Sequence, residues 1–273
     1  MIKSCVTISL VPSLAGGPWI YWDELEVSIG KAKSAGFDAV ELYTASADAI
    51  HSERLADFLQ EYNVALAGVG TGAGRVLHGL SLTDLDETIR KKAVAFAAEM
   101  IVFGARFGAP AIIGSMQGFA ERTTNKEQAV CLLSEGLTVL AKEAADCGVD
   151  LIIEPLNRYE TNLVNTLADG VELIKSLDAD NVYLLTDLFH MNIEEASICD
   201  SIRAGGEHIG YVHFVDSNRR AAGMGHIDLS RVSRALWDIG FDGYASAEAL
   251  PWPDSDVAAA QTMAAFHQFL IPP

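Results

Sequence analysis

The chain has 273 residues, of which 50% are hydrophobic and 21% are charged, and this composition is typical of a folded protein rather than a disordered one. Its 19 Lys and Arg residues against 37 Asp and Glu residues give a net charge of −18. This balance excludes the basic surface on which non-specific nucleic-acid binding depends, so we expect no nucleic-acid partner. The length fits two domains or one α/β barrel of about 250 residues.

The positions of the cysteines and the hydropathy of the chain indicate the cellular compartment in which the protein is expected. The four cysteines lie far apart in the sequence, which argues against a disulfide framework and against a cysteine-ligated zinc site: Cys5, Cys131, Cys147 and Cys199. The first residues, MIKSCVTISLV, lack the apolar core of a signal peptide. No run approaches the ~20 apolar residues of a membrane span. We therefore expect a cytoplasmic protein with no membrane partner.

Short apolar runs alternate with longer helical patterns along the whole chain. In chain order, strands are predicted over residues 5–10, 39–42, 64–69, 111–113, 150–153, 182–186, 211–215 and 244–247. The clearest helical patterns cover residues 84–107, 125–147 and 166–177. Such alternation implies parallel strands, and no linker divides the chain, so we predict a single domain over residues 1–273. Eight strand–helix units of about 34 residues favour a (β/α)8 TIM barrel, with an open doubly wound sheet as the alternative.

Four residues able to bind a metal ion lie at the ends of the last four predicted strands: Glu154, Asp187, His213 and Glu248. In a barrel, residues about one repeat apart at the same strand height converge on one mouth. Three carboxylates and an imidazole would need a divalent cation to offset their repulsion, and this donor set suits Mn²⁺, Mg²⁺ or Co²⁺ better than structural zinc. Alternatively, an acid after a strand caps the next helix, but four in phase favour a metal site.

Further polar residues follow the same strands. Glu160, His190 and Arg219 lie on the loops after the fifth, sixth and seventh predicted strands, where they are placed to hold substrate oxygens. The simpler interpretations are a surface residue at a helix start for His190 and a solvated loop cation for Arg219. Four more residues of the last loop are candidates for supporting these groups: Asp216, Asn218, His226 and Asp228.

Two other features carry less information. The run GVGTGA at residues 68–73 matches G-x-G-x-x-A, but the following GRVLHGLSL does not predict a helix. We therefore expect a tight turn or an open backbone near substrate, not a dinucleotide site. The aromatic residues Trp19, Tyr21 and Trp22 are compatible with a pocket wall, a partner surface or a packing lid, as is Trp252 between two prolines.

Several motifs between residues 150 and 250 resemble those of the ketose 3-epimerases and follow one another in the same order. They are IIEPLNRYETNLVNT, TDLFHMNIEE, HFVDSNR with GMGHID, and GYASAEAL. These epimerases are the D-tagatose and D-allulose 3-epimerase family of xylose isomerase-like TIM barrels. Residues 68–92 look more like a branch that contains 5-keto-L-gluconate epimerase. The segment through Trp22 does not match the substrate-lining pattern of the sugar epimerases, so the resemblance does not name the sugar.

The resemblance implies an isomerase that inverts the carbon next to the carbonyl of a ketose or keto-sugar acid through an enediolate. It makes Glu154, Asp187, His213 and Glu248 the ligands of one divalent ion, for which we expect Mn²⁺. It also makes Glu154 and Glu248 the acid/base pair, with Glu160, His190 and Arg219 on the sugar substrate. A metal that polarises the carbonyl and two carboxylates that exchange protons suit this chemistry. The resemblance alone implies a homo-oligomer, a dimer or tetramer.

Three other functions use parts of the same pattern. An aldose–ketose isomerase of the hydroxypyruvate isomerase type would return the proton to the neighbouring carbon. A zinc endonuclease for abasic DNA sites shares the D-x-x-H of Asp187 and His190. It would however carry D-x-H where this chain has His226-Ile227-Asp228, and further histidines that are missing here. A sugar-binding protein without catalysis is disfavoured because both candidate acid/base glutamates are present.

Overall fold

Eight parallel strands close a barrel in which each strand pairs with its neighbours in chain order, and the last strand pairs with the first. The computed structural model describes residues 1–120 and 125–271. The strands are β1 (Lys3–Ser9), β2 (Ala39–Tyr43), β3 (Ala65–Gly70), β4 (Ala111–Ile113), β5 (Leu151–Ile153), β6 (Val182–Asp187), β7 (Ile209–His213) and β8 (Tyr244–Ala247). The predicted TIM barrel is therefore confirmed, and the open sheet is excluded.

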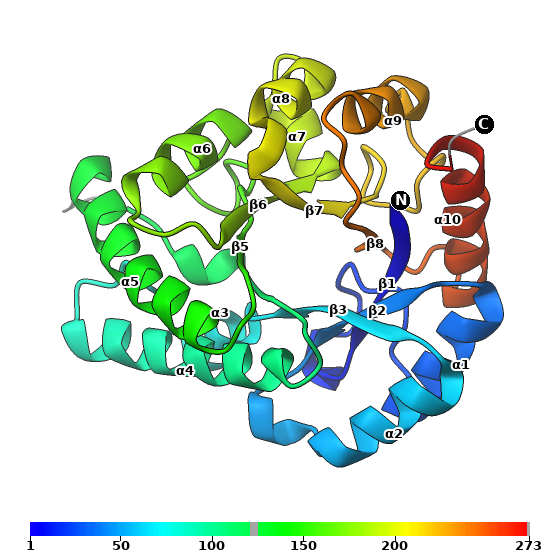
Figure 1. Ribbon diagram of the computed structural model, residues 1–273, viewed down its shortest axis with the longest axis horizontal. Coiled ribbons are helices and arrows are strands. Elements are labelled where there is room, and N and C mark those ends of the chain that lie inside the picture. Colours follow the sequence, from blue (N-terminus) through cyan, green and yellow to red (C-terminus); the bar gives the residue numbers. More distant parts are fainter. Residues whose placement is uncertain (121–124, 272–273) are drawn as a thin grey trace.

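Helices surround the barrel and cover the outer face of its strands (Figure 1). They are α1 (Leu25–Ala35), α2 (Ser52–Tyr62), α3 (Ala73–His78), α4 (Glu87–Ala105), α5 (Lys126–Asp146), α6 (Leu167–Ser176), α7 (Leu188–Glu194), α8 (Ile198–Gly205), α9 (Leu229–Asp238) and α10 (Ser255–Phe269). Short 3-10 turns lie at Pro12–Leu14, Ala47–Ala49, Ser115–Gln117 and Gly206–His208. None of the helices in residues 1–120 and 125–271 is long and apolar enough to cross a bilayer.

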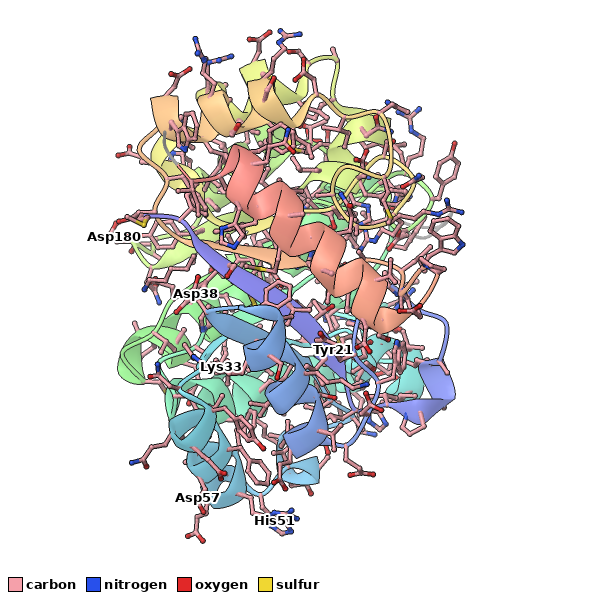
Figure 2. All side chains as sticks on the ribbon, turned by 90° about the vertical axis from the view of Figure 1, so that its right-hand side faces the viewer. Tyr21, Lys33, Asp38, His51, Asp57 and Asp180 are labelled. Carbon is pink, nitrogen blue, oxygen red and sulfur yellow. The ribbon has the colours of Figure 1, made fainter. Side chains whose placement is uncertain are left out.

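Polar side chains set where the helices begin. Asp86 and Asn125 accept backbone N–H groups at the starts of α4 and α5, and Thr166 forms a capping box with Asp169 at α6. Figure 2 shows α10 lying beside α1 across β1, where the last strand–helix unit meets the first. This contact covers the seam at which the barrel closes.

Two sequence predictions are corrected. The seventh strand is Ile209–His213 and not residues 211–215. Gly210 lies inside the strand, where a methyl group would lie 2.7 Å from Tyr183 Cβ, and Val215 pairs with Ala221 within the following loop. After the glycine-rich run a short helix, α3, does form, contrary to the expectation of a turn or open backbone.

The barrel interior is apolar at its amino-terminal end. Seven buried side chains form this inner layer: Cys5, Ala39, Ala67, Ile112, Ile152, Leu185 and Tyr211. Gly68 allows this layer to pack, because a methyl group there would lie 3.0 Å from Ile112 Cδ1. Polar groups are consequently concentrated at the carboxyl ends of the strands, the end at which TIM barrels place their active sites.

Candidate active site at the barrel mouth

The structure brings together the four residues that the sequence analysis singled out as metal ligands. Glu154 follows β5, Asp187 ends β6, His213 ends β7 and Glu248 follows β8. One candidate ligand atom from each residue lies within 4.8 Å of the others, and no other such group occurs among residues 1–120 and 125–271. Because these are neighbouring parallel strands, their carboxyl ends meet at one point of the mouth.

His213 lies at the centre of the group. Its Nδ1 is 3.1 Å from Asp187 Oδ2, 3.3 Å from Glu154 Oε1 and 3.5 Å from Glu248 Oε2. Burial disfavours the imidazolium, but the carboxylates of Glu248 and Glu41 raise the pKa of His213 well above its ordinary value. These three distances show that Nδ1 of His213 faces the space between Asp187, Glu154 and Glu248.

Asp187 divides its two oxygens between structure and site. Oδ1 caps α7 by accepting the backbone N–H groups of Phe189 (2.8 Å) and His190 (3.1 Å). Oδ2 faces the site, where it accepts from Arg219 Nη1 at 3.0 Å. Burial alone would raise the pKa of Asp187, but the charge of Arg219 together with the imidazoles of His190 and His213 outweighs burial and holds the pKa well below its usual range. The helix-cap interpretation and the metal-site interpretation therefore both apply to Asp187, because Oδ1 caps α7 while Oδ2 faces the site.

The two glutamates are buried acids. Burial raises the pKa of Glu248 to about 8, against the opposing charge of Arg219, and it also raises the pKa of Glu154. Such pKa values suit groups that both take up and release protons near neutral pH. A glycine makes room for one of them, because a methyl group on Gly114 would lie 2.6 Å from Glu154 Oε2.

The donor set fits a divalent cation. Glu154 Oε1 is buried and has no hydrogen-bond partner within the described part of the chain, although it lies 3.3 Å from the imidazole of His213. A buried carboxylate oxygen left unsatisfied is costly unless a ligand completes its surroundings. Together with the convergence of three acids, this observation supports the group as a candidate metal site.

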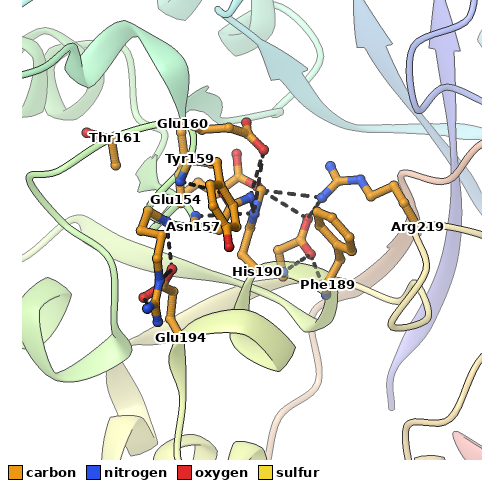
Figure 3. Close-up of polar contacts among 12 residues, drawn as sticks. Glu154, Asn157, Tyr159, Glu160, Thr161, Phe189, His190, Glu194 and Arg219 are labelled. Carbon is orange, nitrogen blue, oxygen red and sulfur yellow. Dashed lines mark hydrogen bonds and ion pairs between the residues drawn. The ribbon is translucent and has the colours of Figure 1, made fainter.

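His190 and Glu160 are joined through Asn157, as Figure 3 shows. The amide Nδ2 of Asn157 donates to Glu160 Oε1 at 2.8 Å and lies 2.7 Å from His190 Nδ1. His190 is only 2% exposed, so it is not the surface residue that the simpler interpretation expected. Its burial lowers its pKa to about 4.

Arg219 reaches into the group from the loop after β7. Its side chain, 13% exposed, contacts Asp187 and Glu248, and its guanidinium lies 4.8 Å from the ring centre of Phe189 (Figure 3). Its backbone has φ +62°, a left-handed conformation that is uncommon for arginine. It is therefore not a solvated loop cation, whereas the neighbouring Arg220 packs over the ring of Trp252 outside the group.

The four supporting candidates in this loop differ in role. Asp216 is fully buried and accepts the backbone N–H groups of Ser217, Gly223 and Ile227, so it shapes the loop that carries Arg219. Asn218 bonds to loop backbone, and Asp228 caps α9. His226 is exposed. Of these four residues, only Asp216 is a buried side chain that holds the loop backbone through hydrogen bonds.

The glycine-rich run accommodates an aromatic side chain. Methyl groups on Gly70 and Gly72 would lie 3.1 Å and 3.0 Å from the ring carbon and hydroxyl of Tyr43. Tyr43 packs on Trp19, with ring centres 4.3 Å apart, and Trp19 packs on Trp22. These glycines and aromatic residues form a packed layer beside the carboxyl ends of β2 and β3.

Two residues at the site had no assigned role in the sequence analysis. Asn157 lies inside a recognised motif, but its contact with His190 spans 33 residues of sequence. Glu41 lies 3.4 Å from His213 Nε2, within a strand whose other residues are buried. The available signal for Glu41 was a single acid inside a predicted apolar strand, because Glu is almost never fully buried without a partner.

Comparison with known proteins agrees with this fold. Residues 29–266 match the family described as xylose isomerase-like TIM barrel. The chain is 32% identical over 239 residues to D-psicose 3-epimerase of Ruminiclostridium cellulolyticum, covering 82% of this chain and 80% of the relative. It is 30% identical over 225 residues to L-ribulose 3-epimerase of Mesorhizobium japonicum, covering 80% and 73%.

A solved structure gives the same result. The crystal structure of D-psicose 3-epimerase with D-tagatose from Clostridium cellulolyticum H10 superposes with a TM-score of 0.83 at 26% identity, covering 99% of this chain and 100% of that one. Both sequence relatives are named as epimerases, which are isomerases. The chain therefore belongs to the xylose isomerase-like TIM barrel family, in which its relatives include ketose 3-epimerases.

Proposed function

We propose that the protein is a metal-dependent sugar epimerase that inverts the carbon next to the carbonyl of a ketose. The observation that carries the proposal is the convergence of Glu154, Asp187, His213 and Glu248 at the barrel mouth. The names of its relatives supply the reaction class, since they act as 3-epimerases on D-psicose and L-ribulose.

The same four residues would hold one divalent ion, through the carboxylates and Nδ1 of His213. We propose Mn²⁺, with Mg²⁺ and Co²⁺ as the alternatives that an oxygen-rich set also suits. When bound, the ion supplies a Lewis acid that polarises the substrate carbonyl and stabilises the negative charge of the enediolate.

Glu154 and Glu248 would carry the proton transfers. They follow β5 and β8, which are separated by two strands in the barrel, so they reach the substrate from different directions. One carboxylate removes the proton next to the carbonyl, and the other acid delivers a proton to the opposite face, which inverts the centre.

His190, Arg219 and Glu160 would bind and orient the sugar. His190 and Arg219 would donate to the oxygens where negative charge develops, and Glu160 would accept from a hydroxyl group. Asn157 would hold His190 and Glu160 in place through its side-chain amide.

Charge at the mouth favours a neutral ketose over a keto-sugar acid. Among residues 1–120 and 125–271, Arg219 is the one arginine or lysine that pairs with the four-residue group, and Asp187 and Glu248 already engage it. A substrate carboxylate would meet Glu160 and the other acids without a cation of its own. A homo-oligomer, a cytoplasmic location and a single domain over residues 1–273 stay predictions of the sequence.

The test is incubation with Mn²⁺ and a panel of ketoses and ketouronates in deuterated water. The proposal expects deuterium at the inverted carbon, C3, of a neutral ketose and no aldose product. Deuterium at C1 together with an aldose would identify an aldose–ketose isomerase instead. Metal analysis should find one divalent ion per chain, and three zinc ions would point to the endonuclease chemistry.

A further inference from the structure

Glu41 is a buried acid that reaches His213 from the opposite side of the barrel. It lies in β2, whose neighbours are β1 and β3, whereas His213 ends β7. Its carboxylate is nevertheless 3.4 Å from His213 Nε2, the ring nitrogen that points away from the three acids of the mouth. Glu41 is only 5% exposed.

The surroundings of Glu41 contain little that stabilises a buried charge. Oε2 accepts a hydrogen bond from the Tyr211 hydroxyl at 3.0 Å. Within residues 1–120 and 125–271 its one ion-pair partner is His213, and no lysine or arginine contacts it. A buried carboxylate is expensive unless it is paired, and a whole buried ion pair can often be replaced by apolar residues of similar size with no loss of stability. Packing alone therefore does not account for a glutamate at this position.

The geometry divides the two nitrogens of His213 between two tasks. Nδ1 lies 3.1–3.5 Å from Asp187, Glu154 and Glu248, where the proposed metal ion would sit. A ligating imidazole keeps a proton only on its other nitrogen, which here is Nε2. The nearest acidic acceptor for that proton is Glu41.

We propose that Glu41 is a positioning residue that holds His213 with its proton on Nε2 and strengthens Nδ1 as a metal ligand. The inference rests on the metal site of the proposed function. A carboxylate that accepts the N–H of a ligating histidine fixes the orientation of the ring and makes the ligating nitrogen more basic. Tyr211 in turn holds the carboxylate from the apolar layer below.

The test is the affinity of the full-length protein for Mn²⁺, measured by the electron paramagnetic resonance signal of free Mn²⁺, with no substrate present. Glu41→Gln keeps the shape of the side chain but removes the charge, so it should weaken binding about tenfold. Glu41→Leu also removes the acceptor, and it should weaken binding by up to about 100-fold. Ile112→Val is the matched control, because it changes the same buried layer but removes no polar contact of Glu41 or His213, and its affinity should stay within about twofold of wild type.

Two further measurements separate positioning from structural support. Urea unfolding of the metal-free proteins shows which variants are folded, and Mn²⁺ affinities are compared only among folded variants. The imidazole ¹⁵N spectrum of the Mg²⁺-loaded protein should show His213 protonated on Nε2, and the Nε2–H resonance should move in Glu41→Leu to the position of an imidazole N–H that has lost its carboxylate acceptor. A folded Glu41→Leu or Glu41→Gln protein with wild-type Mn²⁺ affinity overturns the inference. Wild-type protein that binds no divalent ion overturns the proposed metal site itself.

Discussion

Asn157 determines which nitrogen of His190 carries the proton. The backbone N–H of Asn157 lies 3.3 Å from His190 Nδ1, and its side-chain Nδ2 lies 2.7 Å from the same atom. The amide is oriented by its own oxygen, which accepts the backbone N–H of Tyr159 at 3.0 Å. Nδ1 therefore faces two donors and must be the acceptor. Because burial lowers the pKa of His190 to about 4, the ring is neutral at pH 7 and its proton is on Nε2.

This tautomer leaves a donor free for the substrate. Nε2 lies 3.7 Å from Glu154 Oε1 and 3.8 Å from Asp187 Oδ2, both too far for a hydrogen bond. Arg219 Nη1 lies 3.3 Å from Nε2, and it could donate there only in the other tautomer, which would remove the acceptor that faces Asn157. A neutral imidazole that presents N–H to the site is the form that stabilises a developing oxyanion.

Replacing His190 should therefore reduce kcat more than it changes KM. His190→Phe keeps a buried ring but removes the donor, and we expect kcat to fall about 10²–10³-fold, as for the loss of other oxyanion donors. Asn157→Ala is the matched variant, because the backbone N–H of residue 157 still faces Nδ1. Its kcat should fall less. Steady-state kinetics test this, and an equal loss in both variants would contradict the assigned tautomer.

Removing one acid/base glutamate should stop inversion without stopping all proton exchange. In Glu154→Gln and Glu248→Gln the remaining carboxylate can still remove a proton from its own face and return deuterium to the same face. Each variant should then exchange the C3 proton of a different epimer in deuterated water, while epimerisation falls about 10²–10⁴-fold.

The readout for this prediction is the ¹H NMR spectrum of each pure epimer over time. Saturating metal and a direct metal titration guard against loss of binding, since both glutamates are candidate ligands. If both variants exchanged the same epimer, the assignment of one glutamate to each face would be wrong.

Divalent ions should stabilise the folded protein. The four converging groups repel one another without a cation, and a ligand at 100 times its dissociation constant adds about 2.7 kcal/mol. Thermal unfolding should therefore shift upward with Mn²⁺ and return after EDTA. Asp187→Asn should lose the shift, whereas Asp228→Asn should keep it, because Asp228 caps α9 without contacting the group. An unchanged melting temperature with Mn²⁺, Mg²⁺ and Co²⁺ would argue against the site.

Asp216 should make part of the stability sensitive to acid. Burial favours its neutral form, but the backbone N–H groups of Ser217 and Ile227, with others of the loop, hold its pKa below the ordinary value. A carboxyl group whose pKa is depressed on folding stabilises above its unfolded value of about 3.9, and this contribution is lost as pH falls through the folded pKa.

The variant that isolates this effect is Asp216→Asn. Its amide cannot accept from all of these donors, so at pH 7 we expect a loss of about 2 kcal/mol in the free energy of unfolding. The difference from wild type should shrink at pH 3, which is below the unfolded pKa of about 3.9, because the unfolded wild-type chain has then taken up the proton. Urea unfolding at both pH values measures it, and a constant difference would show that the charge is not involved.

Much of this protein is determined locally in the sequence. The alternation of apolar runs and helical patterns is sufficient for a parallel α/β fold, because each strand needs a helix to return the chain and to cover its outer face. The spacing of Glu154, Asp187, His213 and Glu248 is sufficient to place them at one mouth, because strand ends in a barrel share one face. Even the capping role of Asp187 follows from its position before α7.

Contacts between distant parts of the chain were decided only by the tertiary structure. The short helix α3 forms where its own residues predict none, since Met116 and Phe96 pack closely against Gly74 within it. Glu41 and His213 are 172 positions apart by their residue numbers. Their side chains lie 3.4 Å apart only because the barrel closes between β8 and β1, which places β2 three strands from β7. The proton position on His190 likewise depends on a neighbour from another loop, Asn157. The periodicity of a sequence indicates which face of a helix or strand a residue occupies. Hydrogen bonds across the barrel depend on how the sheet closes, and no short segment of the sequence determines that closure.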